Sequence, residues 1–325
     1  MNKSNRWLPN TSIEILIKRS LIISKIRNFF LKFSVLEVET PILNKYPVTD
    51  ASLSQFMTTY TSPNKEKKCN LWLSTSPEYY MKRLLAAGSG PIYQISHSFR
   101  NGEKGDFHNP EFTILEWYRP GYLMHDLILE VVELLKLVLK CKKVEIISYQ
   151  NIFLKYFKID PLSASIKILK NIAKKLGISN LITLTKNVNN LLEILFMKEI
   201  EPRIGKKYPI CIYHFPRNQA ALSAINVNDN RIADRFEFFF KGIELGNGFY
   251  ELTDAKEQKK RFVMDNRKRK ELGLPECILD VDFLDSLEKG TFPKCSGMAI
   301  GIDRLVMLAL KHKKIHDVTS FDFNE

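Results

Sequence analysis

The chain has 325 residues, 45% of them hydrophobic, and a formal net charge of +13 at neutral pH. This length and apolar content predict a folded protein with a sizeable core, and no run approaches the roughly 20 apolar residues of a membrane-spanning helix. The five cysteines show no C-x-x-C spacing, which argues against disulfides or a zinc site and favours a reducing, cytoplasmic location. The positive charge fits either an acidic partner or a compositional bias toward Lys, Asn and Ile.

The first predicted element is a long helix over residues 10–33, where apolar residues recur at helical spacing. Thr11 or Ser12 can cap its amino end. Three strands are then expected, at residues 35–38, 49–61 and 70–73. A second helix begins within the sequence T-S-P-E-Y, with Ser76 as the cap, Pro77 at the first helical position and Glu78 in the first turn. Taken alone, Glu78 only complements the helix dipole.

The most informative stretch is a predicted pair of strands at 92–99 and 112–117, joined by a polar loop. Arg100 stands where the first strand ends, and arginine suits bidentate contacts with phosphate. Phe112 opens the return strand and offers a flat apolar surface for a base. An arginine and an aromatic ring on paired strands indicate a nucleotide site built on a sheet. The G-x-x-x-x-G-K-[ST] phosphate loop is absent from the sequence.

The middle of the chain carries apolar residues at helical spacing but no group of residues typical of a catalytic or metal site. We interpret residues 150–205 as a helical insertion and a candidate partner surface. Helices are expected at 126–139, with Asp126 as the cap, and at 149–157, 165–176 and 181–200. A strand is expected at 209–215.

A strand and hairpin are predicted at 235–254, where Glu237, Glu244 and Glu251 are spaced by seven. On a helix this spacing gives one solvated stripe, but three glycines in seven residues make a poor helix. On a hairpin the carboxylates can converge, and Gly246 and Gly248 allow a close backbone approach to a ligand, or a bulge. Converging carboxylates favour Mg²⁺, which commonly bridges one or two carboxylates to nucleotide phosphates.

Three segments resemble the motifs of class II aminoacyl-tRNA synthetases of the lysyl type, and they occur in the order expected for that family. The segment F-S-V-L-E-V-E-T-P at residues 33–41 resembles motif 1, although Ser34 stands where glycine is usual. The segments F-R-N around Arg100, H-N-P-E-F and L-E-W-Y resemble motif 2. The segment S-G-M-A-I-G-I-D-R-L at residues 296–305 resembles motif 3. By itself, motif 3 reads equally well as a strand-to-helix junction packed through glycines. The resemblance implies an α+β fold with an antiparallel sheet flanked by helices.

The length and the segments T-S-P-E-Y, G-P-I-Y-Q, E-W-Y-R-P and C-S-G-M-A-I-G resemble the narrower family of elongation factor P–lysine ligases. The resemblance implies one catalytic domain over 1–325, with an insertion at about 150–205 and without an N-terminal anticodon-binding domain. It implies ATP-dependent activation of (R)-β-lysine as an adenylate and transfer to a lysine ε-amine of elongation factor P. A homodimer through motif 1, no membrane association and no tRNA partner are also implied.

The site residues follow from the same resemblance. Arg100 and Arg304 are the expected catalytic residues, and Glu237 and Glu244 the expected Mg²⁺ ligands. The expected ATP-binding residues are Arg100, Asn101, Gly102, Glu103, His108, Asn109, Phe112, Glu244, Leu245, Gly301 and Arg304. The expected substrate-binding residues are Ser76, Pro77, Glu78, Glu116, Tyr118, Asn247, Glu251 and Ala299.

Besides Ser34, one departure from the family pattern, one supporting residue and three alternatives accompany this interpretation. The family sequence is R-N-E, whereas Gly102 stands at the third position here, so Glu103 is expected to replace the missing glutamate. Ala299 matches the β-lysine ligases, whereas lysyl-tRNA synthetases usually have glycine; one methyl contributes only about 1–3 kcal/mol of discrimination. The alternatives are a truncated lysyl-tRNA synthetase-like enzyme using α-lysine, a non-catalytic paralogue that regulates a partner, and a small-molecule amide ligase.

Overall fold

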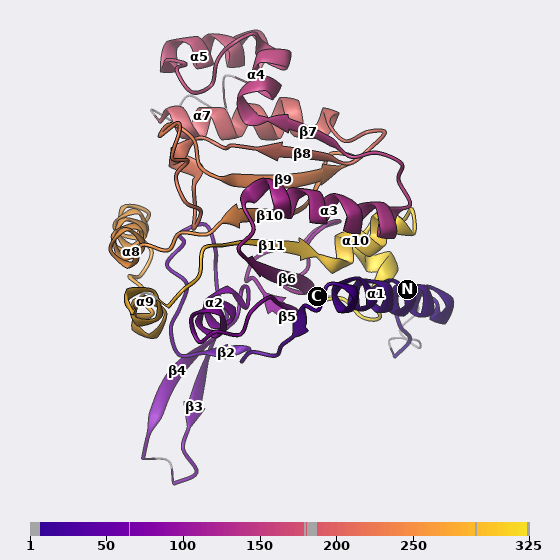
Figure 1. The fold of residues 1–325 in the computed structure, drawn as a ribbon, viewed down its shortest axis with the longest axis vertical. Helices are drawn as coiled ribbons and strands as arrows, with labels where there is room; N and C mark the ends of the chain where they lie inside the picture. Colours follow the sequence, from indigo (N-terminus) through magenta and orange to yellow (C-terminus); the bar gives the residue numbers. More distant parts are fainter. Residues whose placement is uncertain (1–6, 65, 179, 181–186, 290, 324–325) are drawn as a thin grey trace. The chain divides into compact units, whose positions relative to one another are not determined.

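A computed structural model describes residues 7–64, 66–178, 180, 187–289 and 291–323. The chain packs as two compact units, which are described separately (Figure 1). Unit 1 contains the chain up to residue 121, residues 253–294, and the chain from residue 299. Unit 2 contains residues 122–252 and 295–298. The interpretation of the chain as one catalytic domain stays a prediction.

Unit 1 combines a sheet, a small three-stranded sheet and several helices. Its helices are α1 (Ile13–Lys32), α2 (Glu78–Ala86), α8 (Ala255–Glu271), α9 (Val281–Glu288), α10 (Ile302–Ala309) and the 3-10 helix η5 (Ile315–Val318). Its strands are β1 (Leu36–Glu37), β2 (Leu43–Asn44), β3 (Met57–Thr61), β4 (Lys68–Leu73), β5 (Ile92–Phe99), β6 (Glu111–Pro120) and the end of β11 (Cys295–Gly301). The strand orders are β1-β5-β6-β11 and β2-β4-β3.

The α1 helix packs its apolar face against the β5–β6 hairpin. Ser12 caps the helix by accepting a hydrogen bond from the Ile15 N–H, so the second of the two predicted caps is the one used. Phe30 is buried and stacks on Tyr93 of β5 with ring centroids 4.5 Å apart. Its ring also meets Trp117 of β6 at 5.4 Å. These aromatic contacts fix α1 on the hairpin that carries the predicted nucleotide loop.

Unit 2 contains the rest of the strands and a group of helices. Its helices are α3 (Met124–Leu139), α4 (Tyr149–Phe157), α5 (Ile166–Lys175), α7 (Val188–Leu195), the π-helix η2 (Phe196–Ile200), and the 3-10 helices η3 (Glu201–Arg203) and η4 (Arg217–Gln219). Its strands are β7 (Glu145–Ser148), β8 (Ile210–Tyr213), β9 (Arg235–Phe240), β10 (Ile243–Tyr250) and the start of β11. The strand order is β11-β10-β9-β8-β7.

A cluster of aromatic rings anchors the helices of unit 2 to its strands. Tyr149 of α4 stacks on Phe153 at 4.7 Å and on Phe196 at 5.6 Å. Phe196 in turn meets Phe239 of β9 at 5.6 Å. The predicted helices at 149–157 and 165–176 are confirmed, and α7 lies within the prediction of 181–200, whose residues 181–186 are outside the described chain.

The predicted α+β fold is confirmed, with a mixed sheet pattern. Most strand pairs are antiparallel, but β1 pairs with β5 and β7 pairs with β8 in parallel. The parallel pairs involve short strands at the outer end of each strand order. Parallel neighbours need a crossover connection, and helices supply it in both units.

Several sequence predictions of elements were wrong or incomplete. The strand predicted at 49–61 is extended only from Met57, because Asp50 and Ser52 form a side-chain-capped turn with a 2.8 Å hydrogen bond. Asp126 is not the cap of α3; Leu123 precedes the helix, and Asp126 accepts a hydrogen bond from its N–H. The elements α8, α9 and β7 were not predicted.

Candidate active site

Arg100 lies at the end of β5 beside the predicted aromatic surface. Its backbone N–H bonds to the Pro110 carbonyl oxygen at 2.9 Å, which closes the loop. The guanidinium carbon lies 5.1 Å from the centroid of the Phe112 ring, and Nη1 is 3.6 Å from a carboxylate oxygen of Glu103. Within the described chain, the buried Nε has no hydrogen-bond partner. An orphaned guanidinium donor above a ring fits a phosphate-bearing ligand.

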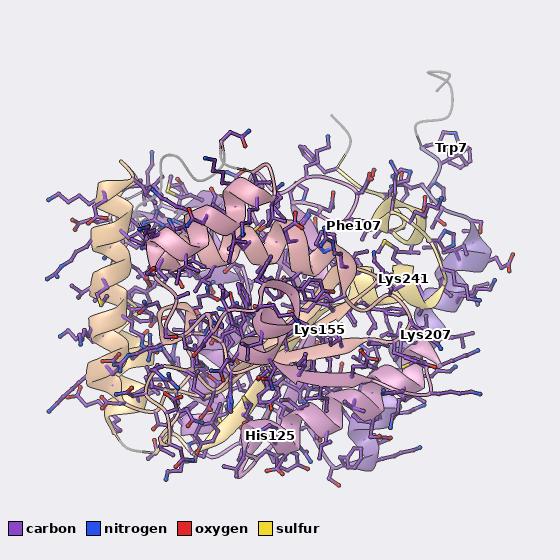
Figure 2. All side chains as sticks on the ribbon, turned by 90° about the horizontal axis from the view of Figure 1, so that it is seen from above. Trp7, Phe107, His125, Lys155, Lys207 and Lys241 are labelled. Atoms are coloured by element: carbon purple, nitrogen blue, oxygen red, sulfur yellow. The ribbon has the colours of Figure 1, made fainter. Side chains whose placement is uncertain are left out.

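The predicted nucleotide loop also contacts the arginine of the third motif. Arg304 of α10 donates from Nε to the Phe107 carbonyl oxygen at 3.0 Å, and Nη2 lies 2.6 Å from Nε2 of His108. Phe107, whose carbonyl oxygen accepts the hydrogen bond from Arg304, is labelled in Figure 2. The structure therefore brings His108 and Arg304 together, although they are far apart in the sequence.

A buried polar network holds α10 in place. The carboxylate of Asp303 lies 2.7 Å from Nη2 of Arg19 on α1 and accepts a hydrogen bond from the Thr113 N–H of β6 at 2.9 Å. Arg19 also donates to the Thr113 hydroxyl. Asp303 is 5% exposed, so its charge is neutralised inside the fold. Sequence reasoning missed Arg19 and Asp303; the only signal was the D-R pair of the third motif.

Three other loop residues are fixed by their backbone conformation or by hydrogen bonds. Gly102 has φ of +81°, a left-handed conformation that favours glycine. Asn101 donates its N–H to the Ser54 carbonyl oxygen at 2.9 Å. The side chain of Asn109 donates to the Glu111 carbonyl oxygen and accepts from the Phe323 N–H. The role expected for Glu103 at the adenine stays a prediction.

The carboxylate of Glu116 lies beneath the start of α2. It accepts hydrogen bonds from the Ser76 hydroxyl and the Tyr118 hydroxyl, both at 2.6 Å. Burial raises the pKa of Glu116 to about 8, and the nearby charge of Glu78 adds to the rise. The prediction that Pro77 occupies the first helical position was wrong, because Pro77 precedes the helix and Ser76 accepts from the Glu78 N–H at 3.1 Å.

Glu78 has a partner that sequence reasoning missed. The ammonium of Lys82, one turn later on α2, lies 2.6 Å from a carboxylate oxygen of Glu78. The Lys82 side chain is 1% exposed and its ammonium lies 5.9 Å from the centroid of the Phe283 ring. Ser76, Glu78, Glu116 and Tyr118 are thus brought together in unit 1, with a buried cation beside them.

In unit 2, a β-bulge determines which side chains share a face. Glu244 pairs with Phe239, and the next residue pair is Gly246 with Phe238, so Leu245 is an extra residue in β10. Side chains alternate along a strand, and one extra residue reverses the alternation. Glu244 therefore shares a face with Asn247, whose Nδ2 lies 3.4 Å from its carboxylate.

The same face carries Glu237 of β9, because Asn247 pairs with Glu237 across the hairpin. Glu251 follows β10 directly, and continued alternation from Asn247 would place it on this face as well. Without the bulge, Glu244 and Glu251 would be on opposite faces, because they are seven residues apart. Glu251 is 2% exposed, and its N–H bonds to the Cys295 carbonyl oxygen at 3.0 Å. The sequence-based expectation that Gly246 permits a bulge is confirmed.

Glu237 is a buried carboxylate with a neighbouring arginine. Burial raises its pKa to about 7, Arg235 opposes the rise, and Glu244 adds to it. Arg235 contacts the Glu237 carboxylate, donates to the Gln219 carbonyl oxygen at 2.6 Å and lies over the Phe215 ring. Among the described residues, no group of three or more His, Cys, Asp or Glu side chains can hold a metal ion. Two mutually repelling carboxylates fit a cation that takes its other ligands from phosphates and water.

Residues 5–325 match the family of class II tRNA synthetases (D, K and N). This chain belongs to that family. Within the class II synthetases, it is 54% identical over 319 residues to the elongation factor P–(R)-β-lysine ligase of Buchnera aphidicola subsp. Acyrthosiphon pisum, covering 98% of each chain. It is 52% identical over 321 residues to the ligases of that name from Erwinia tasmaniensis and Proteus mirabilis, covering 99% of this chain and 98% of theirs.

The remaining predicted site residues lie toward the carboxyl end of strand β11 and in the β9–β10 hairpin. Ala299 and Gly301 end β11, and α10 with Arg304 follows directly. Leu245 is buried as the extra residue of the bulge.

None of the helices in the described part of the chain has the length and apolar content needed to cross a membrane.

Proposed function

We propose that this chain is an ATP-dependent ligase that activates (R)-β-lysine as an aminoacyl adenylate and transfers it to a lysine ε-amine of elongation factor P. The supporting observation is identity of 52–54% with proteins named for this reaction over nearly the full length of both chains. The catalytic residues of the two steps below are our assignments within that function.

In the first step, a carboxylate oxygen of the amino acid attacks the α-phosphorus of ATP. A new P–O bond forms, the bond to the pyrophosphate oxygen breaks, and pyrophosphate leaves. The attacking carboxylate is already ionised and needs no general base. We assign Arg100 to the α-phosphate and Arg304 to the γ-phosphate, since each presents a guanidinium at the nucleotide loop. Fixed guanidinium donors stabilise the charge that develops in the transition state.

In unit 1, we assign Glu116 to an ammonium group of the substrate, with Ser76 and Tyr118 orienting its carboxyl group. Without substrate this group holds its proton up to about pH 8. A bound ammonium would favour the ionised carboxylate, so we expect substrate binding to release that proton. A diamino acid carries two cations, and each needs a counter-charge once it leaves water. Glu78 is a weaker counter-charge for a substrate ammonium than the resemblance implies, because Lys82 already neutralises its carboxylate. In unit 2, Asn247 and Glu251 keep the substrate-binding role that the resemblance gives them, as does Ala299 in unit 1.

We assign Glu237 and Glu244 to a Mg²⁺ ion. Both carboxylates lie on one face of the β9–β10 hairpin, and their repulsion contributes to the raised pKa of Glu237. The ion would offset that repulsion and withdraw charge from the nucleotide phosphates. Arg235 keeps the Glu237 carboxylate oriented by contacting it and the Gln219 carbonyl oxygen.

In the second step, the ε-amine of the acceptor lysine attacks the carbonyl carbon of the adenylate. The amine is neutral when it attacks; a C–N bond forms, the bond to the phosphate oxygen breaks, AMP leaves, and the nitrogen releases a proton to water. The product is an amide on the acceptor lysine.

We also propose a cytoplasmic homodimer that associates through the first motif. Ile13, Ile17 and Leu21 form an apolar stripe on α1 and are 63%, 56% and 57% exposed. Leu36 of β1, at the outer end of the strand order, is 55% exposed. Exposed apolar side chains that share one face of a helix are typical of a protein interface.

Intact-mass measurement of purified elongation factor P tests the proposed function. Incubation with this protein, ATP and (R)-β-lysine should add one β-lysyl group to one lysine, and omission of ATP should abolish the addition. Arg100→Ala should abolish adenylate formation while leaving the protein folded. Transfer that survives Arg100→Ala would contradict the assigned phosphate role, and absence of transfer by the unmodified protein would contradict the function.

A further inference from the structure

Among the described strands of unit 2, β7 has a neighbour on one side only. It lies at the end of the strand order and pairs with β8 in parallel, with Glu145 opposite Ile210. The Glu145 N–H bonds to the Pro209 carbonyl oxygen at 2.8 Å. In a parallel pair, alternate residues bond to the neighbouring strand. The backbone N–H and C=O of Ile146 therefore point away from β8.

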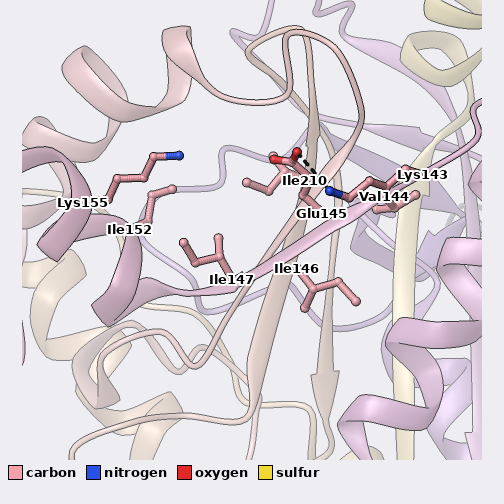
Figure 3. Close-up of a pocket in the computed structure, with 8 residues that line it drawn as sticks. All are labelled: Lys143, Val144, Glu145, Ile146, Ile147, Ile152, Lys155 and Ile210. Carbon is pink, nitrogen blue, oxygen red and sulfur yellow. Dashed lines mark ion pairs between the residues drawn. The ribbon is translucent and has the colours of Figure 1, made fainter.

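A hollow runs along this edge. Its lining includes both Ile146 and Ile147 of β7, with Ile152 and Lys155 of α4 (Figure 3). Neighbouring side chains of a strand point to opposite faces, so a hollow that both of them line follows the edge itself. Ile146 is 44% exposed, and such a free edge is a template for an added strand.

Positive charge flanks the hollow. Lys155 is exposed and labelled in Figure 2, and within the described chain it has no ion-pair partner. On the other side, Lys143 lies 3.8 Å from a carboxylate oxygen of Glu145 and is 63% exposed (Figure 3). Lys140 and Lys142 precede this pair in the sequence. Glu145 also lines the hollow and offsets the charge of Lys143, so Lys155 supplies the positive charge that is left over. Four isoleucines and one valine complete the lining, which complements a segment with apolar side chains and an acidic one near Lys155.

We propose that β7 is the docking edge for the protein acceptor, and that an extended acidic segment of the acceptor adds as a strand beside it. Main-chain hydrogen bonds to Ile146 would supply affinity, while the hollow and Lys155 would supply specificity. This inference rests on the proposed function for the identity of the acceptor. The apolar lining favours a protein over a nucleic acid, whose phosphate backbone needs only cations.

The position of β7 within unit 2 supports this role. It lies two strands from β9, which carries Glu237. At a strand spacing of about 4.8 Å, an added strand would run about 14 Å from β9. An acceptor docked on this edge would thus run in the same sheet as β9, with β7 and β8 between them.

A proline substitution tests the edge directly. Ile146→Pro removes an N–H that points away from β8, so it leaves the ladder intact, and proline is accepted at such edge positions. Ile146→Val is the matched control, because it keeps the N–H and the branched side chain. We expect the proline variant to raise the KM for elongation factor P about tenfold, as for one or two lost hydrogen bonds. ATP–pyrophosphate exchange should be unchanged in both variants.

Charge reversal tests the complementarity. Lys155→Glu should raise the KM for the acceptor several-fold. Lys256→Glu on α8 is a charge-matched control at another exposed lysine. If the two reversals raise the KM equally, general electrostatic attraction accounts for the effect and the specific docking edge is contradicted.

Amide hydrogen exchange supplies a readout that is independent of catalysis. Addition of elongation factor P should slow exchange at Ile146, whose N–H faces away from β8, and should leave Glu145 nearly unchanged, since its N–H is already bonded. Protection of Ile146 that depends on the concentration of this protein alone would identify a second copy as the occupant and overturn the proposal. Wild-type KM in Ile146→Pro would also overturn it. If the wild-type protein shows no pyrophosphate exchange, the proposed function fails, and slowed exchange at Ile146 still decides the docking edge.

Discussion

The ammonium of Lys82 lies 2.6 Å from the carboxylate of Glu78, and the lysine side chain is almost fully buried. The two residues are one turn apart on α2, so the pair forms as soon as the helix does. Family resemblance alone assigns Glu78 to the amino group of the substrate. The structure gives its charge an internal partner, which makes Glu116 the stronger candidate for that role in unit 1.

Replacing Lys82 tests the structural value of this pair. Lys82→Met leaves the Glu78 carboxylate without its cation in a largely buried setting. We expect the free energy of unfolding to fall by roughly 3 kcal/mol, as measured by urea denaturation. Lys18→Met is a matched control, because Lys18 and Glu14 are also one turn apart at 2.6 Å but exposed. Equal destabilisation in the two variants would contradict the importance of burial.

The raised pKa of Glu116 predicts a pH-dependent stability. In the folded protein the carboxyl group holds its proton up to about pH 8, whereas the unfolded chain releases it near the ordinary value of 4.5. The favourable contribution is therefore complete below pH 4.5 and is lost as the pH rises through about 8. Glu116→Gln cannot ionise and should avoid that loss.

We expect Glu116→Gln and the wild-type protein to differ little in unfolding free energy at pH 5. At pH 9 the variant should be more stable by a few kcal/mol, the size that a shift of several pKa units implies. Urea denaturation across this pH range measures the difference. A difference that stays constant with pH would mean that Glu116 is ionised throughout.

Gly102 is the position where this chain departs from the R-N-E sequence of its family. Its φ of +81° strains any L-residue, although a Cβ there meets no atom within 4 Å. Gly102→Glu should therefore lower the unfolding free energy by about 1 kcal/mol and should not improve the KM for ATP. Gly102→Asn, which tolerates this backbone conformation better, should lie closer to the wild type. Tighter ATP binding by Gly102→Glu would show that the loop readopts the geometry of the family.

The exposed apolar stripe on α1 predicts that a charged substitution there dissociates the proposed homodimer. Leu21→Glu places a charge in the centre of the proposed interface and should convert a dimer to a monomer in light scattering coupled to gel filtration. Leu129→Glu on α3 is the control, since Leu129 is 59% exposed on a different helix. A monomeric wild-type protein, or dissociation by both substitutions, would contradict the assigned interface.

The sequence predicted the elements whose local signals are strong. Alternating residues indicated the β5–β6 and β9–β10 hairpins, and the resemblance of residues 296–305 to motif 3 predicted the junction of β11 and α10. The bulge at Leu245 was foreseen only as a possibility offered by Gly246. Its effect on which carboxylates share a face depends on the register of pairing, which the sequence does not state.

Other features depend on contacts between distant segments. Lysine usually lies at the surface, so no pattern indicated that Lys82 is buried. The contact of Arg19 with Asp303 joins two ends of the chain. β7 has only four residues, and α8 carries charge on most of its surface, so neither shows a clear apolar period.

The most direct test of the central claim is ATP–pyrophosphate exchange by the purified protein, comparing (R)-β-lysine with L-α-lysine. Strong exchange with the β-isomer and weak exchange with the α-isomer is the predicted result. Preference for the α-isomer would contradict the substrate assignment and favour a lysyl-tRNA synthetase-like enzyme. No exchange with either amino acid, in a folded protein that binds ATP, would contradict the ligase function itself.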